Sequence, residues 1–187
     1  SLSPDSKWVR PEILLFVMAA AMPLSFGTWQ ALLNNFTIER AAFTGVEIGI
    51  LQSLREIPGF LSFAVVFVLL LVREQTLALA SLMLLAIGTA VTGYFPSVTG
   101  LYFTTVLMST GFHYYETVNQ SLQLQWFDKV TAAQNMGRLV AIRSFASLLA
   151  FGMVWLMLDI FNVSMETVYV ISGGATIAIT VFCLLVF

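Results

Sequence analysis

Residues 109–120 read Ser-Thr-Gly-Phe-His-Tyr-Tyr-Glu-Thr-Val-Asn-Gln, a polar run inside a long apolar part of the chain. Residues 98–108 before it are apolar or hydroxylic, and the next loop is predicted near 126–131. This pattern predicts a membrane helix with ionisable residues near its middle, where each charge costs about 3 kcal/mol or more. Such residues usually face a partner or a wet cavity, so the run contains the candidate lining of a solute pathway.

Four polar residues of this run repeat with the period of a helix. They fall on one stripe at 3.6 residues per turn: Ser109, His113, Glu116 and Gln120. We therefore expect them to share a water-accessible face. His113 and Glu116 also have the spacing of two metal ligands, but no second cluster in the sequence completes such a site. We expect no metal.

The composition of the chain agrees with a membrane protein. Of 187 residues, 59% are hydrophobic and only 10% are charged, whereas soluble domains carry about 25% charged residues. The net charge of −2 does not indicate a nucleic-acid partner, and the single Cys183 has no second cysteine for a disulfide. We find no nucleophile motif, phosphate-binding loop or ligand cluster, so we expect neither an enzyme nor a cofactor.

Six apolar segments are each long enough for the roughly 20 residues that a membrane span requires. They lie at about 11–34, 45–72, 76–94, 98–124, 134–158 and 167–187. The loops between them are short, which predicts that consecutive helices are neighbours. The expected fold is therefore an all-α membrane protein with one domain of six transmembrane helices.

The positions of lysine and arginine predict the orientation of this domain. One side would carry four of them, Lys7, Arg10, Arg73 and Lys129, and the other side only Arg40. Because positive charge collects in cytoplasmic loops, both ends of the segment should be cytoplasmic, in a plasma or inner membrane. The expected outer loops are 35–44, 95–97 and 159–166.

A sequence frame recurs in the second and fifth segments. Residues 49–57 read Gly-Ile-Leu-Gln-Ser-Leu-Arg-Glu-Ile and residues 137–145 read Gly-Arg-Leu-Val-Ala-Ile-Arg-Ser-Phe, which aligns Arg55 with Arg143. The two segments are three spans apart, so the copies cross the membrane in opposite directions. We predict an inverted repeat of three plus three helices, units 11–94 and 98–187, as found in many secondary transporters. Chance similarity between two apolar helices is the alternative.

Six spans, an inverted repeat, cytoplasmic ends and polar residues in the first and fourth helices together resemble the amino-terminal half of a major facilitator superfamily transporter. The resemblance covers the whole chain. It departs from the family between the second and third helices, where the family commonly carries Gly-x-Leu-x-Asp-x-x-Gly-Arg-(Lys/Arg) and this chain has Arg-Glu-Gln at 73–75.

The resemblance implies that the first and fourth helices line a central cavity, the second and fifth flank it, and the third and sixth face lipid. It also implies about twelve helices in two halves. The chain ends at Phe187 within apolar sequence, so we expect a second six-helix half from the same parent chain. A homodimer of half-size proteins is the alternative.

Three charged residues are expected near the middle of the membrane: Arg55, Glu116 and Arg143. Glu116 and Arg143, on helices joined by a short loop, are a predicted ion pair. An arginine there can also bind a carboxylate or phosphate of a solute. A pair that only neutralises itself and fixes helix packing is the alternative. Glu56 is about 100° round the helix from Arg55, so both should not enter one cavity unless residues 57–59 distort the turn.

The expected function is secondary active transport of a small solute by alternating access, coupled to protons through Glu116 or, as second choice, Glu56. Desolvation favours a neutral Glu116 and a nearby Arg143 favours the charged form, so a change in hydration can load or release its proton. Gln30 on the first helix is expected to add hydrogen bonds to the cavity. The alternative function is a membrane scaffold or sensor that binds a partner and transports nothing.

Overall fold

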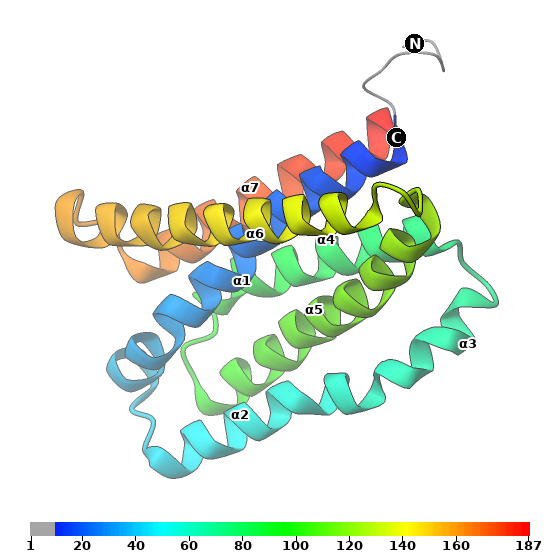
Figure 1. The fold of residues 1–187 in the computed structure, drawn as a ribbon. Coiled ribbons are helices and arrows are strands. Elements are labelled where there is room, and N and C mark those ends of the chain that lie inside the picture. Colours follow the sequence, from blue (N-terminus) through cyan, green and yellow to red (C-terminus); the bar gives the residue numbers. More distant parts are fainter. Residues whose placement is uncertain (1–9) are drawn as a thin grey trace.

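The computed structural model describes residues 10–187, and within them it is entirely helical (Figure 1). Lys7, which entered the predicted orientation, lies outside the described residues. The elements in chain order are α1 (Pro11–Ala41), α2 (Gly45–Phe60), the 3-10 turn η1 (Leu61–Ala64), α3 (Val65–Leu69), α4 (Glu74–Thr92), α5 (Val98–Trp126), α6 (Ala132–Trp155), the π-helical turn η2 (Leu156–Ile160) and α7 (Met165–Val186).

The six apolar segments predicted from the sequence are all helical. The second is continuous through α2, η1 and α3, and the fifth is continuous through α6 and η2. The first helix runs past its predicted end at residue 34, because the added turns are held by α7. Phe36 is fully buried with its ring against Tyr169, and Arg40 pairs with Glu166 at 3.1 Å. The predicted outer loop 35–44 therefore shrinks to the few residues between α1 and α2.

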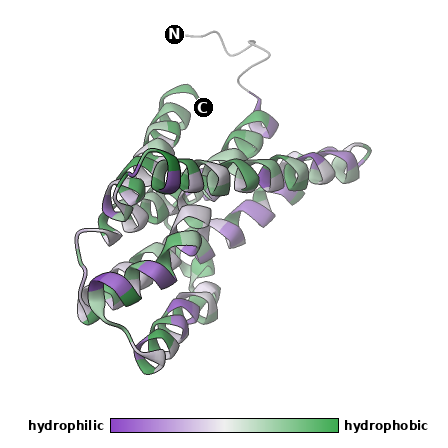
Figure 2. Cartoon of the chain, turned by 90° about the vertical axis from the view of Figure 1, so that its left-hand side faces the viewer, coloured by the Kyte–Doolittle hydropathy of each residue, from purple (hydrophilic) through white to green (hydrophobic). Residues whose placement is uncertain are grey.

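Five of these helical segments are long and apolar enough to cross a membrane: Pro11–Ala41, Gly45–Leu69, Glu74–Thr92, Ala132–Ile160 and Met165–Val186. Figure 2 shows that hydrophobic residues dominate the helices. This content is consistent with a multi-pass membrane protein. Helix α5 has the length of a span, with 29 residues, but not the hydropathy. The difference lies in the polar run that includes residues 109–120.

Helix α4 stands at the centre of the packing, against α5 and α7. Glycines allow these contacts. A Cβ on Gly88 of α4 would lie 2.7 Å from the backbone of Met108 in α5, and a Cβ on Gly173 of α7 would lie 2.6 Å from the carbonyl oxygen of Ala86 in α4. Gly111 of α5 is even closer to the α4 backbone. Small residues at these positions let the helix axes approach closely.

Helices α2 and α6 pack on partners that are distant in sequence. Helix α2 packs on α5, and α6 packs on α1 (Figure 1). Consecutive helices were expected to be neighbours, but among consecutive α-helices only α4 and α5 pack closely along their length. Helices α5 and α6 meet mainly through side chains such as Glu116 and Arg143. A short loop brings two helix ends together, but the close packing is decided by which faces are complementary.

Hydroxyl groups join α1 to α7 in the interior. Ser25 Oγ donates to Thr176 Oγ1 at 2.7 Å, and Thr28 Oγ1 donates to Ser172 Oγ at 3.0 Å. All four residues are buried. These bonds satisfy polar groups that would otherwise be costly in an apolar bundle, and they hold α1 in the position from which it contributes to the site below.

Candidate solute-binding site

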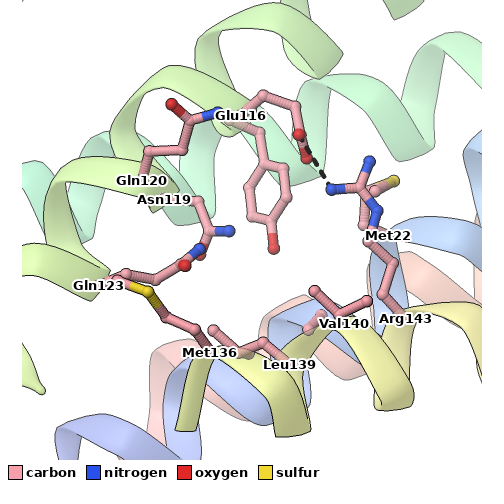
Figure 3. Close-up of a pocket in the computed structure, with 11 residues that line it drawn as sticks. Met22, Glu116, Asn119, Gln120, Gln123, Met136, Leu139, Val140 and Arg143 are labelled. Atoms are coloured by element: carbon pink, nitrogen blue, oxygen red, sulfur yellow. Dashed lines mark hydrogen bonds and ion pairs between the residues drawn. The ribbon is translucent and has the colours of Figure 1, made fainter. Parts of the chain in front are cut away.

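A pocket of about 310 Å³ lies between α5 and α6, with α1 on its third side (Figure 3). Helix α5 provides Tyr115, Glu116, Asn119, Gln120 and Gln123. Helix α6 provides Met136, Leu139, Val140 and Arg143, and α1 provides Ala19 and Met22. The pocket therefore has a polar wall on α5 and a largely apolar wall on α6 and α1.

The predicted ion pair of Glu116 and Arg143 is present at this pocket. Arg143 Nη1 donates to Glu116 Oε2 at 2.9 Å, joining α5 to α6 (Figure 3). The pair is partly buried: 41% of the Arg143 side chain and 22% of the Glu116 side chain are exposed. The exposure arises because the pocket opens beside the pair, so both groups remain within reach of a ligand.

Four buried polar atoms of α5 have no hydrogen-bond partner: Thr105 Oγ1 and, in the second half of the helix, the three atoms Tyr115 Oη, Glu116 Oε1 and Asn119 Oδ1. The last three belong to residues that line the pocket. A buried polar atom without a partner costs about 1–3 kcal/mol. A cluster of such atoms beside one cavity is therefore typical of a site whose partners come from a ligand or from ordered water.

A second pocket, of about 260 Å³, adjoins Arg143 on the other side along α1 and α6. Its lining includes Gln30, Phe26 and Ser147 as well as Arg143. The side chain of Gln30 is exposed. Arg143 thus lies between two hollows, one toward the carboxyl end of α5 and the other toward the carboxyl half of α6.

The structure divides the predicted site residues into two groups. Gln30, Glu116, Gln120 and Arg143 line the two pockets around Arg143. Arg55, Glu56, Ser109 and His113 line neither of them. The predicted stripe on α5 faces α2 at one end and α6 at the other.

Ser109 and His113 were expected on a water-accessible face, and the structure places both against α2. Ser109 is 1% exposed and its hydroxyl donates to the carbonyl oxygen of Arg55. A Cβ on Gly59 would lie 2.7 Å from Cε1 of His113, so the imidazole ring packs directly on that glycine. The reason is the course of α5, which leans on α2 in its first half and faces α6 in its second half.

Arg55 and Glu56 form an ion pair with each other. Arg55 Nη2 lies 2.7 Å from Glu56 Oε1, and Arg55 Nε donates to the same oxygen at 2.9 Å. The 100° between their positions does not separate the charged groups, because the arginine side chain is long enough to reach round the helix. Residues 57–59 stay within α2, and the backbone tightens into η1 only after Phe60.

Sequence reasoning did not select Asn119 or Gln123 for the site. Both follow Glu116 at helical spacing, so extending the same period toward the end of α5 would have found them. Within residues 10–187, no three His, Cys, Asp or Glu side chains are grouped as metal ligands.

Comparison with known proteins returned no matching family model, no matching curated protein and no matching solved structure.

Proposed function

We propose that the chain belongs to a secondary active transporter, which moves a small solute by alternating access with coupling to protons. The observation that carries this proposal is the partly exposed Glu116–Arg143 pair beside a pocket whose lining residues include three with a buried polar atom that has no partner. Five helical segments have the hydropathy of membrane spans, and the one that contains Arg143 is among them. Charged side chains within membrane-spanning segments are costly, and they typically mark solute or ion pathways.

The proposal includes α5 as a sixth span. At about 1.5 Å per residue its 29 residues reach about 40 Å, more than the roughly 30 Å of a hydrocarbon core. The two ends of the bundle support this. Pro11, Gln75, Trp126 and Phe187 share one small pocket, so the starts of α1 and α4 lie beside the ends of α5 and α7.

The packing supports an inverted repeat of units 11–94 and 98–187. Exchanging the units turns the α2–α5 contact into the α6–α1 contact, and turns α4–α5 into α7–α1; all four contacts occur. We therefore propose a relationship to the amino-terminal half of major facilitator superfamily transporters. In that orientation both ends of the segment are cytoplasmic, in a plasma or inner membrane.

A second six-helix half is part of the proposal, from the same parent chain or from a homodimer. Helix α6 exposes large apolar side chains, among them Phe145, Leu148 and Leu149, and α2 with η1 exposes Phe60 and Phe63. Lipid and a second half are the two apolar surroundings that would cover them. A second half beside α6 would also complete the open side of the Arg143 pockets.

The test is side-specific cysteine labelling in a Cys183→Ala background. Gln120→Cys and Gln30→Cys, which line the two pockets, should each react with a membrane-impermeant thiol reagent applied from either side, because alternating access opens the site to both. Val118→Cys, buried on the same helix as Gln120, is the control and should stay unlabelled. Labelling of both pocket positions from one side alone would overturn transport and favour the scaffold or sensor.

A further inference from the structure

The charge of the pocket between α5 and α6 restricts the net charge of its ligand. Of the eleven residues that line it, only Glu116 and Arg143 carry charges, and these cancel. A ligand with net charge would leave one charge uncompensated at membrane depth, which is costly. The pocket is therefore suited to a solute with no net charge.

The hydrogen-bonding groups of the pocket require a ligand that both donates and accepts. A guanidinium group has five N–H donors, and one hydrogen bond, to Glu116, occupies Arg143. Glu116 Oε1 and Asn119 Oδ1, on residues that line the same pocket, are buried acceptors without partners. A carboxylate matches the planar fork of the arginine, and an ammonium group matches the two acceptors. The Tyr115 hydroxyl, 1% exposed and also unpartnered, can serve either group.

The remaining lining is apolar and adaptable. Met22, Met136, Leu139 and Val140 face the polar wall across the pocket (Figure 3). Methionine side chains fill irregular space with little strain, so two of them can close on apolar groups of different shape. A sugar would leave hydroxyl groups against this wall without partners. The volume of about 310 Å³ is at the small end of ligand pockets.

We propose that this pocket selects small zwitterions with an apolar side chain, the class of the neutral apolar amino acids. The carboxylate lies on Arg143, the ammonium group lies between Glu116 and Asn119, and the side chain lies against Met136 and Leu139. The inference rests on the proposed function and names the solute of the same site.

The experiment measures binding of radiolabelled leucine to the full-length protein in lipid nanodiscs. The competitors are 3-methylbutylamine, which is leucine without its carboxylate, 4-methylpentanoate, which is leucine without its ammonium group, and glucose. Unlabelled leucine should compete at least about tenfold better than either single-charge analogue, because each loses one charge-assisted contact. Glucose should not compete.

Variants of the polar wall locate the binding. Tyr115→Phe and Asn119→Leu should each weaken leucine binding by about tenfold. Glu116→Gln should weaken leucine but strengthen 4-methylpentanoate, because Arg143 would then compensate the charge of that anion. Arg143→Gln should likewise weaken leucine and strengthen the cation 3-methylbutylamine, which Glu116 would compensate. Tyr102→Phe is the matched control for Tyr115, since its hydroxyl bonds the α2 backbone at Glu47. Arg138→Gln is the control for Arg143, because Arg138 is exposed on α6 outside the pocket. Both controls should bind leucine with unchanged affinity.

No leucine binding at about 10 mM, above the usual range of KM values, would overturn the inference. So would glucose or a single-charge analogue that binds better than leucine, or unchanged leucine affinity in Tyr115→Phe, Asn119→Leu and Glu116→Gln. Thermal unfolding of each variant distinguishes lost binding from lost folding. The labelling of Gln120→Cys needs no ligand, so a failure here with labelling from both sides would reject the solute class and leave transport standing.

Discussion

At the scale of single residues, Glu116 and an anionic group of the solute can compete for the charge of Arg143. Glu116 holds one of its N–H groups, and the rest of the guanidinium group faces the two hollows. Protonation of Glu116 would remove the carboxylate charge, which frees Arg143 for the anionic group of the solute and takes away the charged partner of its ammonium group, so the protonation state of Glu116 would change the affinity for the solute. Proton binding and solute binding would then be linked through a single ion pair.

This linkage predicts the behaviour of Glu116→Gln in proteoliposomes of the full-length protein. Glutamine is fixed in the neutral form, so accumulation of leucine driven by a pH gradient should be lost. Exchange of leucine across the membrane should remain when it is measured at a leucine concentration high enough to offset the weaker binding of this variant. Thr117→Val, the exposed neighbour on the same helix, is the control and should retain both. Unchanged, pH-dependent accumulation in Glu116→Gln would leave the pair with a structural role only.

The ion pair also makes a prediction about stability. Arg143→Gln leaves the Glu116 carboxylate without its partner, while the double variant Glu116→Gln, Arg143→Gln leaves no charge. For a pair as exposed as this one, the coupling energy should be about 1 kcal/mol. We expect a thermal-unfolding cycle in which the double variant is less destabilised than the sum of the single variants. Strict additivity would indicate that the two groups do not interact in the membrane.

At the scale of helices, the close approach of α4 and α5 depends on Gly111. A Cβ there would meet the backbone of Leu85 and Ser81, which cannot move aside as a side chain could. We predict that Gly111→Ala lowers the free energy of unfolding by about 1–3 kcal/mol through overpacking. Gly137→Ala on α6 is the matched control, because no atom of another helix lies within 4 Å of its added Cβ. That variant should be neutral or slightly more stable, as alanine favours helices by about 1 kcal/mol. Equal unfolding midpoints for the two variants would contradict the role of Gly111.

Helix positions were largely predictable because apolar runs of this length have few other structures open to them. The end of α1 was not, since the turns around Phe36 and Arg40 are held by Tyr169 and Glu166, more than 100 residues away in sequence. Helical spacing correctly placed Glu116 and Gln120 together. It could not show that Ser109 and His113 on the same stripe meet α2, because that depends on how α5 crosses its neighbours.

At the scale of the whole molecule, the number of spans decides where the carboxyl end lies. If α5 crosses the membrane, six spans put Phe187 on the same side as Arg10. If α5 does not cross, five spans put it on the opposite side. The shared pocket of Pro11 and Phe187 favours six.

Topology reporters test this prediction directly. Green fluorescent protein should fluoresce when fused after Arg73 or after Phe187, and alkaline phosphatase should be active when fused after Tyr94, because that loop is expected outside. Alkaline phosphatase activity after Phe187, with fluorescence retained after Arg73, would contradict the six-span topology.

The packing of α2 on α5 and of α1 on α6 and α7 has a consequence for synthesis on the ribosome. Helix α2 leaves the ribosome early, but α5, on which it packs, is synthesised only from residue 98 onward. Helices α6 and α7, on which α1 packs, are synthesised later still. During translation the first two helices therefore reside in the bilayer with much of their final contact surface against lipid. Nascent chains that stop before α5 would leave Gly88 of α4, whose Cα meets the α5 backbone in the folded protein, facing lipid.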